Sequence, residues 1–364
     1  MPDTNTSGLN RSIHAQPDAI RELLKDWDGP SRAAEMMAQA GRIFLSGIGT
    51  SFHAASVGEY LLRYAGADAW GVRSFEFVNY PRPLREDDGV IVVSHRGSKI
   101  HGNLAVQRAL SSGVRTVGIT GRDSKMQGDL LVIQTVAQEI SSAHSISYIG
   151  ALTRLAQIAA RLAALKGRTR EAQALEQGLA NLPEAIEDML AREDEVRQIA
   201  NEAAAHERRL FYIGAGPNAV TGPEGALKSK EAAYVTAEGF ELEQAIHGPQ
   251  VSFETQDVMI LVCAPGPAQA RMADLLLALH EIGSRVWLVG EAPSAETTQF
   301  FDGERWKLFA IRYNADLPEE LTPLLTVVPL QLLADFLATA RGTNADSFRA
   351  DQEAYKNAGL RFKL

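Results

Sequence analysis

The sequence predicts an α/β protein with two tandem doubly wound domains, each built on a parallel sheet, joined by a helical connector. Short continuous runs of Val, Ile and Leu, such as VIVV at 90–93 and VMILV at 258–262, are separated by segments of helical length. Because helices cover both faces of a parallel sheet, its strands read as unbroken apolar runs. With 364 residues, the chain is also longer than one hydrophobic core usually serves.

The two halves of the chain repeat one pattern of runs and turns. RIFLSGIG, GVIVVSHRG and VRTVGITG in the first half correspond, in the same order, to RLFYIGAG, DVMILVCAPG and SRVWLVG in the second. Gly47 and Gly214 are 167 residues apart, and Gly113 and Gly283 are 170 residues apart. Such regular spacing indicates an internal duplication. In doubly wound domains, ligands are expected at the carboxyl ends of the strands.

These patterns divide the chain into five parts. We expect an N-terminal helical extension at 1–40, a first α/β domain at 41–165, a helical connector at 166–205, a second α/β domain at 206–340 and a C-terminal active-site tail at 341–364. The connector is rich in Ala, Leu, Glu and Arg at helical spacing, and Pro183 is expected to break it.

The composition limits the partners and the location. A net charge of -9 argues against nucleic acid or an anionic membrane as partner, since clustered basic charge holds both, so any bound anion should be small. No apolar run is expected to reach the ~20 residues of a membrane helix, and the N-terminus is too polar for a signal peptide, which predicts a cytoplasmic protein. Cys263 lies in an apolar run and is predicted to be strand core rather than a nucleophile.

Two turns of the first half have the composition of an anion site. Gly49, Thr50 and Ser51 follow the first strand and open a helix, whose N-terminal N–H groups suit an anion. The turn after the next strand consists of Ser94, His95, Arg96, Gly97, Ser98 and Lys99. Hydroxyls and cations together favour a small anion. The alternatives are a tight turn in which Ser51 caps the helix, and an exposed polar loop.

Neither turn completes a dinucleotide-binding or nucleotide-binding motif. A sugar phosphate bound without a cofactor therefore fits better than NAD or ATP.

A third group of polar residues lies in the second half. Glu224, Lys228 and Glu231 are spaced to share one face of a helix, and His247 follows sixteen residues after Glu231, before Gly-Pro. Taken alone, Glu231 is expected to be an exposed helix acid paired with Lys228.

Six segments in this order resemble the sugar isomerase (SIS) domain family, and most closely the isomerase half of glucosamine-6-phosphate synthase. They are GTSFHA at 49–54, SFEF at 74–77, the turn at 94–99, EGALKSKE at 224–231, HGP at 247–249 and VPLQLLADFLATARGTNAD at 328–346. The similarity runs from about Arg42 to the C-terminus. It implies two flavodoxin-like SIS domains.

The resemblance implies catalytic roles for four residues. Glu231 matches the carboxylate that moves a proton between C1 and C2 of an open-chain sugar phosphate, and a carboxylate shielded from water suits that task. Lys228 matches a lysine near the sugar oxygens. His247 matches a histidine that assists ring opening from the neighbouring subunit, which implies a homodimer with shared active sites. Lys356 matches the tail lysine that forms a Schiff base with the ketose.

The resemblance also implies substrate contacts. The residues that match the phosphate and sugar pocket are Gly49, Thr50, Ser51, Ser94, His95, Arg96, Gly97, Ser98, Lys99, Ser142 and His144. The family needs neither a metal ion nor an organic cofactor, so none is expected here.

Three departures from the family leave the substrate open. About forty residues precede the first strand, without a cysteine near the start, so a glutaminase domain is not expected and neither is glutamine-dependent transfer by this chain alone. The phosphate turn reads SHRGSK where the family commonly has SQSGET. His144 stands where a small hydroxyl residue is usual.

The leading hypothesis is therefore an isomerase or deaminase of a phosphorylated sugar or amino sugar. A deglycase that cleaves a ketosamine phosphate is an alternative, because a turn with His and a basic residue before Gly resembles that of SIS deglycases. A sensor that binds a sugar phosphate without turnover is a second alternative.

Overall fold

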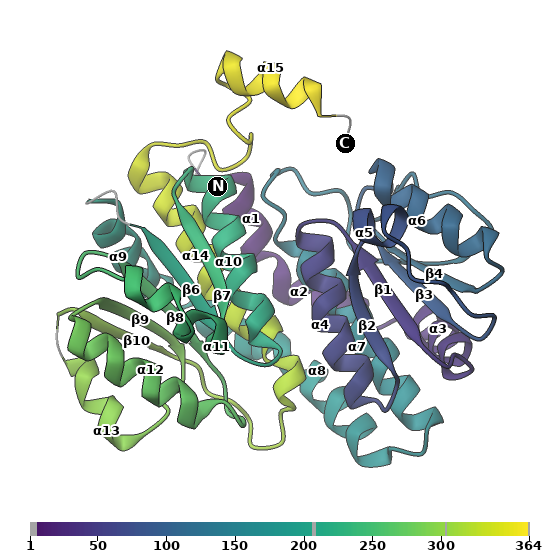
Figure 1. The fold of residues 1–364 in the computed structure, drawn as a ribbon, viewed down its shortest axis with the longest axis horizontal. Helices are drawn as coiled ribbons and strands as arrows, with labels where there is room; N and C mark the ends of the chain where they lie inside the picture. Colours follow the sequence, from purple (N-terminus) through teal and green to yellow (C-terminus); the bar gives the residue numbers. More distant parts are fainter. Residues whose placement is uncertain (1–5, 206–208, 303, 363–364) are drawn as a thin grey trace.

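The computed structural model describes residues 6–205, 209–302 and 304–362. It contains two parallel five-stranded sheets with helices on their faces, which confirms the predicted fold class (Figure 1). The strands of the first sheet are β1 (Ile43–Gly47), β2 (Ala69–Arg73), β3 (Gly89–Val93), β4 (Arg115–Thr120) and β5 (Leu131–Gln134). The strands of the second sheet are β6 (Leu210–Gly214), β7 (Ala237–Glu241), β8 (Val258–Cys263), β9 (Arg285–Gly290) and β10 (Trp306–Ala310).

The two sheets have one topology. The first has the order β2-β1-β3-β4-β5, and the second, followed from its other edge, has the order β7-β6-β8-β9-β10. The predicted duplication is therefore present in the fold. The strand order changes direction between β1 and β3 in the first sheet and between β6 and β8 in the second. Ligands of doubly wound folds bind at such a switch point.

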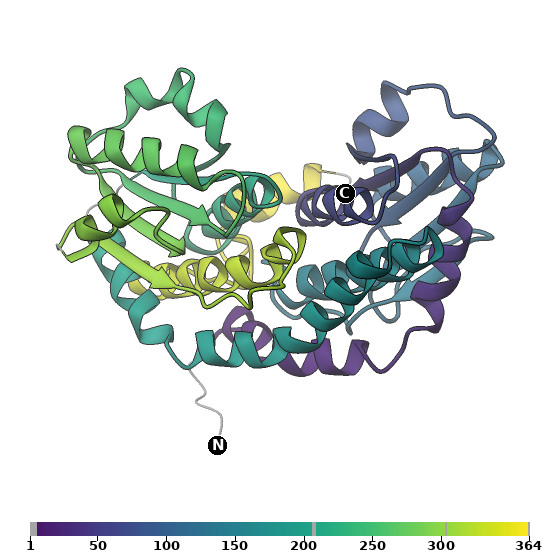
Figure 2. The ribbon, with the colours of Figure 1, turned by 90° about the horizontal axis from the view of Figure 1, so that it is seen from below.

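The helices cover the sheets and join the halves. They are α1 (Gly8–His14), α2 (Gln16–Leu23), α3 (Asp28–Ala38), α4 (Thr50–Tyr64), α5 (Ser74–Asn79), α6 (Ile100–Ser111), α7 (Ile146–Leu165), α8 (Thr169–Leu190), α9 (Glu193–Ala204), α10 (Asn218–Ala233), α11 (Leu242–Ile246), α12 (Gln269–Ile282), α13 (Ala295–Thr298), α14 (Pro323–Arg341) and α15 (Glu353–Arg361). Figure 2 shows the N-terminal helices and α8 running along one side of both halves, where α2 packs against α7 and α8.

The connector differs from the prediction in one respect. Helix α8 continues through Pro183, so the expected break there was wrong. Pro183 is buried together with Leu179, Leu182 and Ile186 on the apolar face of α8. Packing of that face offsets the roughly 3 kcal/mol that an internal proline costs. The chain leaves the helix only after Leu190.

Helix α14 is long and apolar enough to cross a membrane by composition, so the expectation that no segment would be was wrong. Its most apolar window is 100% buried inside the protein, however. The helix packs against α8, α9 and α10, and its side chains join an apolar cluster that also contains Leu45 of the first sheet and Tyr212 of the second. The two halves therefore share one core, and α14 lies within it.

Candidate active site

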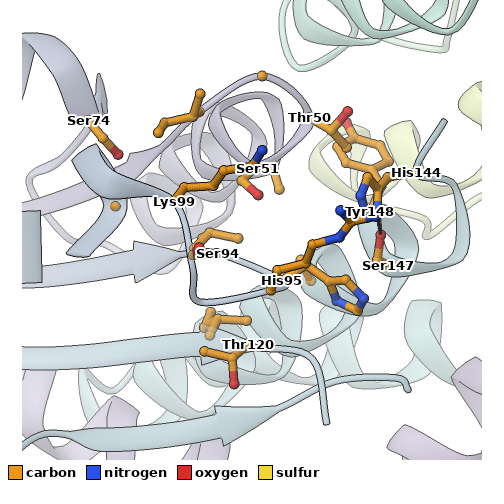
Figure 3. Close-up of a pocket in the computed structure, with 18 of the residues that line it drawn as sticks. Thr50, Ser51, Ser74, Ser94, His95, Lys99, Thr120, His144, Ser147 and Tyr148 are labelled. Carbon is orange, nitrogen blue, oxygen red and sulfur yellow. Dashed lines mark hydrogen bonds between the residues drawn. The ribbon is translucent and has the colours of Figure 1, made fainter. Parts of the chain in front are cut away.

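A cavity of about 440 Å³ lies at the carboxyl ends of β1 and β3, at the switch point of the first sheet. Its wall includes Ile48 to Ser51 after β1, four residues of the turn after β3, and His144, Ser147 and Tyr148 around the start of α7. Glu231 enters from α10, a helix of the second half. Figure 3 shows side chains of both turns and of α7 directed at a common space.

The first turn presents the N-terminus of α4 to the cavity. Gly49 has φ 55° and precedes the first residue of the helix. Gly49, Thr50 and Ser51 all line the cavity, as predicted residues of the anion site. The hydroxyl of Thr50 is already engaged, because it donates to Glu224 Oε1 at 3.1 Å and accepts from Lys228 Nζ at 3.0 Å. Ser51 and the helix N-terminus are therefore the groups of this turn that suit an anion.

The second turn contributes four of its six predicted residues. Ser94, His95, Arg96 and Lys99 line the cavity, whereas Gly97 and Ser98 lie outside its wall. Burial and the neighbouring Arg96 lower the pKa of Lys99. Burial, with a smaller effect of His144, lowers the pKa of His95 to about 4, so its ring is neutral at neutral pH.

Gly97 has a structural reason to be glycine. Its φ is 62°, and a Cβ there would lie 2.2 Å from Ser124 Oγ and 2.3 Å from the Met126 nitrogen. Gly113 has φ 69° with nothing within 4 Å of a Cβ. We expect Gly113→Ala to cost about 1–2 kcal/mol from backbone strain alone, and Gly97→Ala to cost about 3 kcal/mol or more because the clash adds to the strain. Chemical denaturation of both variants measures the difference, and equal losses would show that the turn at Gly97 relaxes freely.

An ion-pair network joins α10 to α4. The Glu224 side chain is fully buried and lies 2.5 Å from His53 Nδ1 and 3.5 Å from Lys228 Nζ. Lys228, also fully buried, forms an ion pair with Glu231. Burial tends to lower the pKa of Lys228, but Glu231 and Glu224 outweigh it and the net shift is upward. The lysine is therefore a charged ammonium held between two carboxylates.

Glu231 is the carboxylate of this network that reaches the cavity, and its side chain is 20% exposed. Burial raises its pKa, and the attraction of Lys228 offsets only part of that effect. The opposite holds for Glu224, since burial tends to raise its pKa but Lys228, His53 and Thr50 bring the net shift below the ordinary value. Glu224 and Glu231, about two helical turns apart on α10, thus have pKa values shifted in opposite directions, an arrangement typical of acid–base sites.

A second network holds His144. Its Nδ1 lies 2.9 Å from Ser147 Oγ and 3.5 Å from Glu139 Oε2. Glu139 also accepts hydrogen bonds from the backbone and hydroxyl of Ser145 at 2.8 and 2.9 Å. Burial tends to raise the pKa of Glu139, but His144, Ser145 and Ser147 outweigh it and lower the pKa to about 2. Ser142, a predicted neighbour, does not line the cavity.

Several polar atoms of the cavity wall have no hydrogen-bond partner among the described residues. They are both ring nitrogens of His95, Oγ1 of Thr120 and the hydroxyl of Tyr148. Buried polar groups are nearly always satisfied in proteins, so these atoms are available to bind a polar molecule or water. Thr120 and Tyr148 were not predicted from the sequence, nor were His53 and Glu139 as site residues.

Two predicted catalytic residues lie away from the cavity of their own chain. His247 follows α11 with its side chain 70% exposed and pairs with Glu243 at 3.0 Å. Lys356 is on α15, a helix without buried residues that stands apart from the body of the protein (Figure 1). The tail nevertheless contributes Phe348 to the cavity wall. The roles of His247 and Lys356 stay predictions that depend on a second subunit or on movement of the tail.

Comparisons with known proteins agree with this architecture. Residues 36–163 match the model of the SIS domain. The isomerizing glutamine–fructose-6-phosphate aminotransferase of Gloeobacter violaceus is 33% identical over 356 residues, which are 93% of this chain and 57% of that protein. The enzyme of the same name from Pyrococcus horikoshii is 31% identical over 342 residues, covering 92% of this chain and 55% of that protein.

Two solved structures share the fold. The C-terminal domain of glucosamine-fructose-6-phosphate aminotransferase from Francisella tularensis has a TM-score of 0.84 at 21% identity, covering 94% of this chain and 99% of that one. Tagatose-6-phosphate ketose/aldose isomerase from Escherichia coli has a TM-score of 0.77 at 17% identity, covering 94% and 95%. The chain spans a little over half the length of the two curated relatives above, at 57% and 55%. Residues 36–163 therefore match the SIS domain, and the chain is similar over nearly its whole length to part of the isomerizing glutamine–fructose-6-phosphate aminotransferases.

Proposed function

We propose that the protein isomerises or deaminates a phosphorylated open-chain hexose or amino sugar by moving a proton between C1 and C2 through Glu231. The observation that carries this proposal is the Glu231 carboxylate, which lines the cavity with a pKa raised by burial and lies beside a buried ammonium. A base that takes a proton from one carbon and returns it to the next works best when its pKa is close to the pH at which the enzyme operates.

The surrounding groups have complementary roles in this proposal. The α4 N-terminus with Ser51, and the turn with Ser94 and Lys99, would bind the phosphate. Lys228 is fully buried and lies outside the cavity wall, so it would act through its positive charge beside Glu231, on the negative charge that develops on the sugar oxygens as the carbon-bound proton leaves. The buried Glu224 holds the ammonium in place through its ion pair.

Deuterium incorporation tests this chemistry. We would incubate the protein in deuterated water with fructose 6-phosphate, glucosamine 6-phosphate or a ketosamine phosphate and follow the C1 and C2 protons by NMR. If the wild-type protein exchanges the C1 or C2 proton of one of these sugars for deuterium and Glu231→Gln does not, the proposal is supported and the sugar class is identified. Thermal stabilisation by a sugar phosphate without any exchange would instead favour the sensor.

A ketosamine-phosphate deglycase is the second candidate, and the mouth of the cavity favours it. Ile48, Phe75 and Ile100 line the cavity with exposed fractions of 44%, 47% and 41%. An apolar mouth suits a substrate whose amine part extends out of the sugar pocket. Release of a free amine from a ketosamine phosphate would separate this reaction from simple isomerisation.

We also propose a homodimer in which His247 serves the cavity of the other subunit, because His247 and the α15 side chains are exposed in one chain. The prediction concerns mixed variants. Glu231→Gln and His247→Ala proteins should each be inactive, and subunit exchange between them should recover about a quarter of the wild-type sites, since half the dimers are mixed and each has one intact site. No recovery in verified mixed dimers would place His247 in its own subunit's site, and an active His247→Ala protein would place it outside catalysis.

A further inference from the structure

His144 lies where a second acid–base group is needed in the proposed reaction. It belongs to the segment between β5 and α7, and its ring lines the cavity with 23% of the side chain exposed. It shares that cavity with Glu231. The ring of His95 lies edge-on at 5.4 Å between centroids.

The hydrogen bonds around His144 determine which ring nitrogen carries the proton. Ser147 Oγ has one hydrogen, and it donates to the carboxylate of Glu139 at 2.8 Å. At its 2.9 Å contact with His144 Nδ1, the same oxygen must therefore accept, so Nδ1 carries a hydrogen. In the neutral ring, Nε2 is then the basic nitrogen. No hydrogen bond to Nε2 is formed within the part of the chain that the structure describes.

Glu139 is placed to orient the His144 ring. Its side chain is fully buried, it accepts hydrogen bonds from the backbone nitrogens of Ser145 and Ser147 at the start of α7, and its low pKa keeps it ionised at neutral pH. A carboxylate at this position, together with Ser147, holds the ring's orientation. The pair resembles the base-and-orienter arrangement of many acid–base sites.

The reaction needs such a group. Conversion of an aldose to a ketose moves one proton from C2 to C1 and a second one from O2 to O1. Glu231 accounts for the first. Two groups close to His144 suit the second transfer less, because His95 is a weak base with its pKa about 4 and burial raises the pKa of the Tyr148 hydroxyl well above its usual range, so that it stays protonated.

We propose that His144 is a second acid–base group of this cavity, which takes the O2 proton on Nε2 and returns it to O1 while Glu231 moves the carbon-bound proton. The ring starts and ends each turnover neutral, so no further reactant is required. Glu139 and Ser147 are positioning residues that act through His144. This inference rests on the proposed function.

The test compares His144→Gln with His14→Gln, a histidine on the surface that pairs with Glu193. We expect His144→Gln to lower kcat by about 10²–10⁴-fold with KM changed only a few-fold, as for loss of a general acid–base group, and His14→Gln to behave as wild type. The titratable or charged groups near the ring are Glu139, His95 and Glu231, and Arg96, Lys99 and His101 line the same cavity. One limb of the wild-type pH profile should therefore disappear in His144→Gln but persist in His95→Gln.

Chemical rescue separates catalysis from structure. Added imidazole should raise kcat of His144→Ala at least about tenfold, because a free imidazole can enter the space and accept the same proton. If the His144 variants do not fold, Ser147→Ala carries the test, with a lowered kcat, an altered pH profile and an unchanged KM.

The inference and the proposed function fail in different ways. A wild-type protein that turns over a sugar phosphate, with His144→Gln at nearly the same kcat and pH profile, overturns the inference alone. An inactive His144→Ala that imidazole does not rescue, combined with wild-type behaviour of Ser147→Ala, also overturns it. Absence of exchange and turnover in the wild-type protein with every sugar removes the proposed function, and this inference with it.

Discussion

Glu231→Gln is expected to lower turnover of the sugar phosphate by about 10³–10⁴-fold while the dissociation constant of the substrate changes only a few-fold. Glutamine has nearly the same shape, and its carbonyl oxygen can still accept a hydrogen bond from Lys228, which contacts Glu231 in the structure. It cannot take a proton from carbon. The substitution leaves the groups proposed to bind the phosphate unchanged, so binding should be retained.

Steady-state kinetics and deuterium exchange at C1 and C2 measure this loss, and calorimetry measures binding. Glu238→Gln is the matched control, because Glu238 is an exposed acid on β7. Turnover in Glu231→Gln equal to that of the control would reject Glu231 as the base. Loss of binding together with turnover would point to a role in holding the substrate rather than in proton transfer.

Lys228→Met is expected to destabilise the protein by about 3–5 kcal/mol and to abolish activity. Methionine fills much of the space, but it leaves Glu224, which is fully buried, without its main cationic partner. Removal of one member of a buried ion pair costs far more than the pair itself contributes. Lys230→Met, an exposed lysine on the same helix, is the matched control and should change stability by less than about 0.5 kcal/mol.

The loss in Lys228→Met should depend on pH with a defined sign. In the wild type the pKa of Glu224 is lowered, so this group stabilises the fold above its unfolded pKa, and that contribution is lost as pH falls through the folded value. Without Lys228 the carboxylate prefers to be protonated. The deficit relative to wild type should therefore shrink as pH falls from 7 toward 4, and urea denaturation across that range measures it. A deficit independent of pH would mean that packing, not charge, causes the loss.

The duplication in the fold does not extend to the chemistry of the two halves. The turn after β8 reads APGP at 264–267, where the first half has hydroxyls, a histidine and cations. A Cβ at Gly266 would lie 2.4 Å from Glu319 Oε2, so the Glu319 carboxylate lies against this turn. A negatively charged ligand is therefore disfavoured there, in contrast to the turn after β3. Burial and Glu320 raise the pKa of Glu319 to about 7. The second half instead supplies α10, which brings Glu231 to the cavity of the first, with Lys228 buried beside it.

Local sequence patterns predicted the interior of each sheet. β1, β3, β6 and β8 are buried along their whole length, so each reads as an apolar run. The edge strands were not predicted. β2 and β7, for example, read AWGVR and AEGFE, with exposed or partly exposed residues and a central glycine, because an edge strand packs on fewer sides and has no reason to be apolar throughout.

The sequence by itself determined the two polar turns at 49–51 and 94–99, the order of the elements, and the helix face that carries Lys228 and Glu231. These features depend on residues that are close together in the chain. Only the tertiary structure decided what those groups meet. Glu224 and His53 are 171 residues apart, and Lys228 and Thr50 are 178 apart, yet each pair is in contact. The same applies to His247, which its motif marks but the fold leaves exposed. The physical reason is that proton affinity and access depend on burial and on the charges nearby, and the packing of α10 against α4 sets both.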